Sequence, residues 1–118
     1  MPTSSQAAAQ PETPAAGGKV VVIEMLTDDG GNNVFRPAEF TVKKGDLVKF
    51  TLGGGVHNVH FPADSNTIAG AKMPPAGPML QLPGTSTNIL VDFPPGTYFY
   101  QCDPHALLGM VGRMTVAP

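Results

Sequence analysis

The sequence predicts an all-β protein, a two-sheet sandwich of about seven or eight strands. Short β-branched or alternating segments recur along the chain, and turns separate them, in keeping with 14 glycines and 13 prolines in 118 residues. No segment keeps a helical period long enough to predict a helix, and no apolar run of eighteen residues predicts a membrane span. A chain of this length forms one domain around one core.

Seven segments carry the strand pattern. Residues 19–26 are rich in Val, and the Asp-, Gly- and Asn-rich residues 27–33 then predict a turn. Residues 39–43 and 47–52 alternate apolar and polar side chains around a Lys-Gly-Asp turn at 44–46, so we expect them to form a β-hairpin. The remaining strands are expected over residues 56–61, 86–93, 97–102 and 111–116.

The first eighteen residues differ in composition from the rest of the chain. Residues 1–18 are rich in Ala, Pro and Gln and contain no aromatic side chain, so we expect a flexible tail or linker before a domain over residues 19–118. The segment lacks the charged and apolar regions of a signal peptide. Such a tail is typical of a tether, which favours a location outside the cytoplasm: the periplasm, the outer face of a membrane or, as an alternative, the thylakoid lumen.

Charge and cysteine content exclude some classes of protein. The net charge is −2 and the basic residues are scattered, so no nucleic-acid partner is expected. The single cysteine excludes an internal disulfide.

The single cysteine, Cys102, belongs to a motif that favours a metal site. His105 and Met110 follow it with the spacing C-x2-H-x4-M, and His57 lies in an upstream strand. Taken alone, each residue has an ordinary structural role, such as a buried thiol, a solvated imidazole or a thioether that fills the core. Together in one loop, a thiol, an imidazole and a thioether suit copper, and the second imidazole completes a His2Cys site with a weak axial Met.

The alternation of side chains along a strand distinguishes the two upstream histidines. Cys102 shares a face with two tyrosines of strand 97–102, so its thiol should point inward. In strand 56–61, His57 shares a face with two apolar side chains, whereas His60 takes the opposite face. Parity therefore favours His57 as the ligand and His60 as a surface residue.

Several motifs together resemble the cupredoxins, the small blue-copper proteins, and among them the plastocyanins most closely. The motifs are Lys44-Gly45-Asp46 with Leu47-Val-Lys-Phe, His57-Asn58-Val59 with Phe61, Pro95-Gly96-Thr97-Tyr98, and Cys102-x-Pro104-His105-x4-Met110-x-Gly112. The resemblance implies a cupredoxin-like Greek-key β-sandwich with one copper ion near one end. It also implies that His57, Cys102 and His105 bind in a plane and that Met110 binds axially at a longer distance.

Three features depart from the plastocyanin pattern. Gln101 stands where plastocyanins have a tyrosine before the ligand cysteine, and Asp103 replaces a small hydroxyl residue after it. The Met-, Pro- and Gly-rich stretch 63–84 has no clear counterpart. These departures concern the redox partner, whereas the metal motif is intact.

We therefore expect a one-electron carrier that cycles between Cu(I) and Cu(II), and no enzyme. The expected partners are redox proteins that dock near His105 and Leu108, with no small-molecule substrate, and the protein is expected to be a monomer. Asn58 should hydrogen-bond across to the cysteine loop near Asp103. Three alternatives remain at this point: a copper storage or delivery protein, a fragment of a multicopper oxidase or nitrite reductase, and a structural zinc protein.

Overall fold

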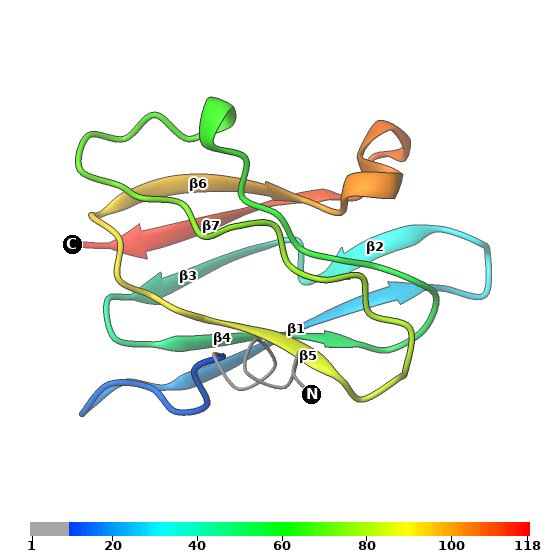
Figure 1. The fold of residues 1–118 in the computed structure, drawn as a ribbon, viewed down its shortest axis with the longest axis horizontal. Coiled ribbons are helices and arrows are strands. Elements are labelled where there is room, and N and C mark those ends of the chain that lie inside the picture. Colours follow the sequence, from blue (N-terminus) through cyan, green and yellow to red (C-terminus); the bar gives the residue numbers. More distant parts are fainter. Residues whose placement is uncertain (1–9) are drawn as a thin grey trace, which may run out of the picture.

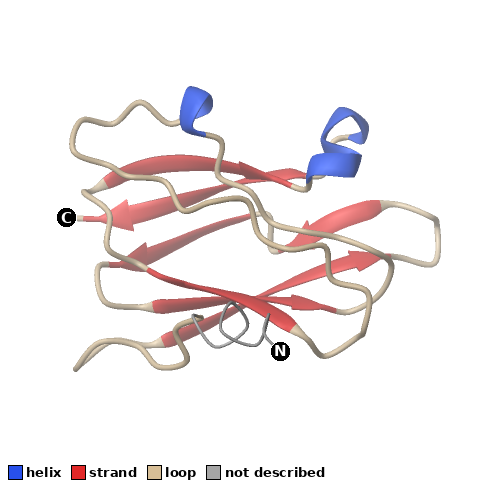
Figure 2. Cartoon of the chain, viewed as in Figure 1, coloured by secondary structure: helices blue, strands red, loops and turns tan. Residues whose placement is uncertain are grey.

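The computed structural model describes residues 10–118 and shows a sandwich of two β-sheets (Figure 1). The strand orders are β2-β1-β4-β5 in one sheet and β3-β7-β6 in the other. Among the described residues, the only helices are two short 3-10 turns, which lie outside the sheets (Figure 2). The elements are β1 (Val20–Thr27), β2 (Asn33–Arg36), β3 (Glu39–Lys43), β4 (Leu47–Leu52), η1 (Ala63–Ser65), β5 (Ser86–Leu90), β6 (Gly96–Gln101), η2 (Asp103–Leu108) and β7 (Val111–Ala117). This architecture confirms the expected all-β sandwich.

The core between the sheets is built around Tyr100, whose side chain is fully buried. Its ring makes edge contacts with Phe35 and Phe50, at centroid distances of 4.7 and 5.3 Å. Its hydroxyl donates a hydrogen bond of 2.6 Å to the carbonyl oxygen of Ala38. Gly112 of β7 makes this approach possible, because a Cβ atom there would lie 2.4 Å from the Tyr100 hydroxyl oxygen.

The expected hairpin of residues 39–43 and 47–52 is wrong, although the bounds of both strands are right. β3 pairs with β7, whereas β4 pairs with β1 and β5, so consecutive strands belong to opposite sheets. The Asp46 carboxylate holds the crossing turn by accepting the N–H groups of Lys43 and Lys19 at 2.9 Å each. A hairpin and a crossover both give alternating strands with one buried face, so the pattern alone does not separate them.

Two other segments differ from the expected pattern. β2, which pairs with the end of β1, was not expected, because it is only four residues long and a proline follows it. The expected strand 56–61 forms only two isolated bridges, from His57 to Leu80 and from His60 to Gln101. This segment therefore joins the long 63–84 stretch to the end of β6, which is where the cysteine follows.

A carboxamide side chain binds one edge strand of each sheet. The Gln10 amide donates to the Ser86 carbonyl at 3.1 Å and accepts the Asn88 N–H at 2.9 Å, on edge strand β5. The Asn66 amide accepts the Phe99 N–H at 2.7 Å and donates to the Phe99 carbonyl at 3.0 Å, on edge strand β6. Each amide therefore pairs with backbone groups that a further strand would otherwise use.

The expected tail is described only in part, since residues 1–9 lie outside the described residues. Within residues 10–18, the Ala15 N–H donates to the Gly45 carbonyl at 2.8 Å, in addition to the contacts of Gln10. The domain boundary at residue 18 stays a prediction. Of the helices that the structure describes, none has the length and apolar character needed to cross a membrane.

The carboxylate of Asp46 should contribute to stability in a pH-dependent way. Burial raises the pKa of Asp46, but hydrogen bonds from the Lys43 and Lys19 N–H groups outweigh it and hold the pKa below its ordinary value. Its contribution is therefore complete above the unfolded-state pKa, about 3.9, and is lost as the pH falls through the lower folded-state pKa.

We predict that Asp46→Asn lowers the free energy of unfolding at pH 7 by about 1–3 kcal/mol, because an amide cannot accept both N–H groups. The difference from wild type should shrink at acidic pH in urea unfolding curves. The control is Asp92→Asn: Asp92 forms an exposed ion pair of 3.5 Å with Lys44, so its loss should cost no more than about 1 kcal/mol. Equal effects of the two variants would contradict the role of Asp46.

Candidate metal centre

Hydrogen bonds between backbone groups of the loop itself fold back the segment between β6 and β7. The Cys102 N–H donates to the Met110 carbonyl at 3.1 Å, the His105 N–H donates to the Cys102 carbonyl at 3.1 Å, and the Met110 N–H donates to the His105 carbonyl at 3.2 Å. Between them η2 makes a compact turn at one end of the sandwich (Figure 1). The antiparallel pair β6 and β7 thus fixes both ends of the loop, and the turn gathers its thiol and imidazole.

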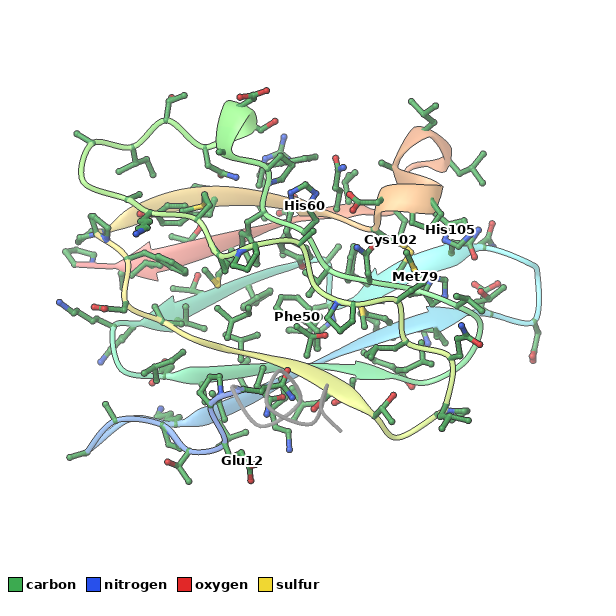
Figure 3. All side chains as sticks on the ribbon, in the orientation of Figure 1. Glu12, Phe50, His60, Met79, Cys102 and His105 are labelled. Atoms are coloured by element: carbon green, nitrogen blue, oxygen red, sulfur yellow. The ribbon has the colours of Figure 1, made fainter. Side chains whose placement is uncertain are left out.

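Three donor atoms converge beneath this loop. The Nδ1 atom of His57 lies 3.2 Å from Nδ1 of His105 and 3.7 Å from Sγ of Cys102, and the third side, from Cys102 Sγ to His105 Nδ1, is 3.4 Å. Figure 3 shows Cys102 and His105 side by side at this end of the molecule. A point equidistant from the three atoms lies about 2 Å from each, which is the length of a bond between a transition metal and an imidazole nitrogen.

The hydrogen bonds around His57 leave its Nδ1 free for a metal. Its other ring nitrogen, Nε2, lies 3.1 Å from the Thr27 hydroxyl oxygen. That hydroxyl donates its own proton to Oδ1 of Asn33 at 2.8 Å, so it accepts the proton of Nε2. The Nδ1 atom of His57 then carries a lone pair that faces a thiol and a second imidazole. One thiolate and two imidazoles form a donor set that suits copper, so the residues fit this metal.

Met110, the fourth expected ligand, lies at the end of the same loop. Its side chain is fully buried, like those of Cys102 and His57, whereas His105 is only partly buried. Its N–H and carbonyl groups bind the backbone of His105 and Cys102, respectively. The structure thus places the Met110 backbone directly beside the cluster.

Burial shifts the titration of two of the clustered groups. Burial raises the pKa of the Cys102 thiol, and the negative charge of Asp103 raises it further. Hydrogen bonds from the backbone N–H groups of Asn58 and His105 lower it, but the net shift is upward. Burial also lowers the pKa of His57, and the neighbouring His105 lowers it further. A hydrogen bond with the Gly54 carbonyl raises the pKa, but the net shift is downward. His57 is therefore neutral at neutral pH, which is the form that binds a metal.

Asn58 joins the two segments that supply the clustered side chains, as expected from the sequence. Its Oδ1 accepts the Asp103 N–H at 2.8 Å, and its Nδ2 donates to the Asp103 carboxylate at 3.1 Å. The backbones of His60 and Gln101 exchange two further hydrogen bonds, of 2.8 and 2.9 Å. His60 stays outside the cluster, as parity predicted, but it is only partly exposed because its ring binds the Asp103 carboxylate at 2.8 Å.

Residues 21–117 match the family model described as copper binding proteins of the plastocyanin/azurin family. The chain belongs to this family. Copper is therefore its cofactor, and the single cluster of three metal-binding side chains found among residues 10–118 corresponds to one ion. The family membership and the sandwich agree with the resemblance inferred from the sequence.

Known relatives support the same assignment. A chloroplastic plastocyanin of Oryza sativa subsp. indica is 38% identical over 104 residues, which cover 86% of this chain and 66% of that protein. A plastocyanin of Solanum crispum is 32% identical over 96 residues, 78% of this chain and 96% of the other. The solved structure of a pseudoazurin from Methylobacterium extorquens aligns with a TM-score of 0.64 and 31% identity, over 83% of this chain and 75% of that one. The chain thus spans just under two thirds of the rice protein.

Spacing in the sequence located the residues that cluster, but it missed a neighbour of His57. His57, Cys102 and His105 come together as expected. Thr27 was not singled out, because a threonine at the start of a polar turn has no distinguishing signal. Only the register of β1 against β2 and the path of residues 53–57 place its hydroxyl beside an imidazole.

Proposed function

We propose that the protein is a one-electron carrier with a type 1 copper site, and not an enzyme. The observation that carries this proposal is the convergence of the Cys102 thiol with two imidazole Nδ1 atoms, where Cys102 and His57 are buried and His105 is partly exposed. His57, Cys102 and His105 would hold the ion, and Met110 would add a weakly bound thioether. Bound copper supplies a couple between Cu(I) and Cu(II).

The burial of the ligands favours a carrier over the alternatives. His57, Cys102 and Met110 have no exposed surface, so a substrate cannot reach them from solvent, and a copper donor or acceptor protein cannot displace them readily. A multicopper enzyme needs further histidine pairs, whereas the described chain holds three histidines in all and one cluster. A thioether is a poor zinc ligand, which disfavours a structural zinc site.

The residues around the site are suited to rapid electron exchange. Asn58 and the His60–Gln101 backbone pair hold the two ligand segments in a fixed relation. Backbone N–H groups of Asn58 and His105 stabilise negative charge on the sulfur. A site held by its surroundings changes little between the two oxidation states, so little reorganisation accompanies electron transfer.

The copper-loaded protein should be intensely blue in its Cu(II) form, because of a thiolate-to-copper absorption band. Cys102→Ser should lose that band and the redox couple. The variant should remain folded, because the core of aromatic and branched side chains lies between the sheets. Absorption spectra with far-UV circular dichroism test this expectation. A variant that kept an intense thiolate-to-copper band would exclude Cys102 as the ligand, and a wild-type protein that bound copper without the band would exclude the type 1 site.

Substitution of Met110 should move the reduction potential in two directions. Met110→Leu removes the thioether and should raise the potential, whereas Met110→Gln, with an oxygen donor, should lower it. We expect each shift to reach about 60 mV, a tenfold change in the equilibrium of a one-electron couple. Voltammetry measures both, with Met114→Leu as the control, since Met114 is equally buried but belongs to β7. Unchanged potentials in both Met110 variants would remove it from the site.

We further propose that redox proteins dock on the surface around His105 and Leu108. His105 is the one clustered ligand that is partly exposed, and the η2 turn beside it presents Leu107 and Leu108 with 101% and 72% exposure. Met79, also exposed, is drawn at the same end as Cys102 and His105 (Figure 3). An apolar surface around an accessible ligand suits the small, weak interfaces of redox encounters.

Leu108→Glu should slow electron exchange without changing the copper spectrum. The added charge would stand in the proposed docking surface, so the second-order rate of self-exchange should fall about threefold or more and become dependent on salt. Val22→Glu is the matched control, because Val22 is an apolar residue with 58% exposure on β1, remote from η2. Equal rates for the wild type and Leu108→Glu would place the electron-transfer surface elsewhere.

We propose a monomer that acts outside the cytoplasm, either free in the periplasm or tethered to the outer face of a membrane through residues 1–18. Gln10 and Asn66, which bind the edges of the two sheets, support a monomeric state. The Ala- and Pro-rich composition of residues 1–18 supports the tether.

A further inference from the structure

His57 is held from outside the metal cluster by a pair of side chains at the junction of β1 and β2. Thr27 ends β1, Asn33 begins β2, and the two residues are partners in the register of these strands. The Thr27 hydroxyl oxygen lies 3.1 Å from Nε2 of His57 and 2.8 Å from Oδ1 of Asn33. Three side chains thus form a chain of hydrogen bonds that leads from the surface to a buried imidazole.

The direction of these hydrogen bonds determines which nitrogen of His57 is free. A threonine hydroxyl has one proton, and Asn33 Oδ1 can only accept it. Thr27 must then accept from His57, so Nε2 carries the ring proton and Nδ1 carries the lone pair. That arrangement is the one a metal requires at Nδ1, whereas a donating threonine would favour the other tautomer.

The backbone around Thr27 is fixed, so the hydroxyl has a defined place. The Thr27 N–H donates to the Gly54 carbonyl at 3.2 Å, and Gly53 N–H donates to the Met25 carbonyl at 2.7 Å. The turn that follows is closed by Asp28, whose carboxylate oxygen accepts two backbone N–H groups at 2.9 Å each. Thr27 is therefore positioned by the sheet and by the turn.

Gly55 leaves the space in which this contact forms. A Cβ atom at Gly55 would lie 2.3 Å from the Thr27 hydroxyl oxygen and 2.7 Å from Nε2 of His57, so any side chain would force the two apart. Its φ of +81° also favours glycine. The glycine run before His57 thus has a role at its last position, in addition to ending β4.

We propose that Thr27, oriented by Asn33 and given space by Gly55, is a positioning residue that fixes the tautomer and the ring orientation of His57 for metal binding. The proposal rests on the proposed copper site. It concerns the hydrogen bond that Nε2 of His57 donates to the Thr27 hydroxyl at the end of β1, beside the backbone carbonyl of Gly54. Because this acceptor is a side chain, mutation can remove it.

The test compares Thr27→Val, which keeps the shape but removes the acceptor, with Thr27→Ser, which keeps the hydroxyl. In the copper-loaded protein reduced to Cu(I), NMR of the His57 ring measures the exchange of the Nε2 proton with water. We expect exchange to be about tenfold faster in Thr27→Val, and competition with a Cu(I) chelator to show an affinity about 10- to 100-fold lower. Thr27→Ser should remain close to wild type in both measurements.

Gly55→Ala provides a second test, with Gly31→Ala as its control. Both glycines have a φ of +81°, but a Cβ atom at Gly31 meets nothing within 4 Å. The two variants therefore share the backbone strain, and only Gly55→Ala should weaken copper binding and speed the exchange of the Nε2 proton. Equal copper affinities of these two variants would contradict the role given to Gly55.

The outcomes separate this inference from the proposed function. A blue wild-type protein whose Thr27→Val variant matches it in exchange and affinity would overturn the positioning role. An equal loss in Thr27→Val and Thr27→Ser would also overturn it, because the loss would not depend on the hydroxyl. A wild-type protein without the blue band would instead contradict the type 1 site itself, and His57 in the metal-free protein would still report its tautomer.

Discussion

The structure depends on bringing three lone pairs together within 4 Å in a buried place. Nδ1 of His57, Nδ1 of His105 and the Cys102 sulfur come from two separate segments, so the surrounding chain must hold these segments together. One segment comes from the β6–β7 loop and the other follows β4, and direct hydrogen bonds between them involve Asn58 and Asp103. Each sheet of the sandwich thus leads into one of the two segments that form the site.

Burial acts on the metal-free cluster in a consistent direction. It favours a neutral thiol at Cys102 and a neutral imidazole at His57, so the apolar surroundings resist any separate charge. A cation held by these residues would replace the thiol proton and would compensate the charge of the thiolate. The same apolar shell that disfavours isolated charge would therefore strengthen the attraction between the Cys102 sulfur and a bound cation.

The sequence contained most of the site but little of the long-range topology. The offset of His105 and Met110 from the only cysteine is local information, and strand parity favoured His57, which lies in the cluster, over His60, which does not. The hairpin around Asp46 was wrong because the pairing of β3 and β4 depends on strands distant in the sequence. The same limit hid Thr27, whose contact with His57 joins segments 30 residues apart.

The amides that bind the sheet edges bear on how the molecule behaves at high concentration. A carboxamide offers one donor and one acceptor with a spacing similar to that of a peptide group, so Gln10 and Asn66 occupy the sites where a foreign strand would begin to add. Each does so with a single side chain instead of a whole strand. The edge strands β5 and β6 are therefore less open to recruitment into extended β-assemblies than bare edges would be.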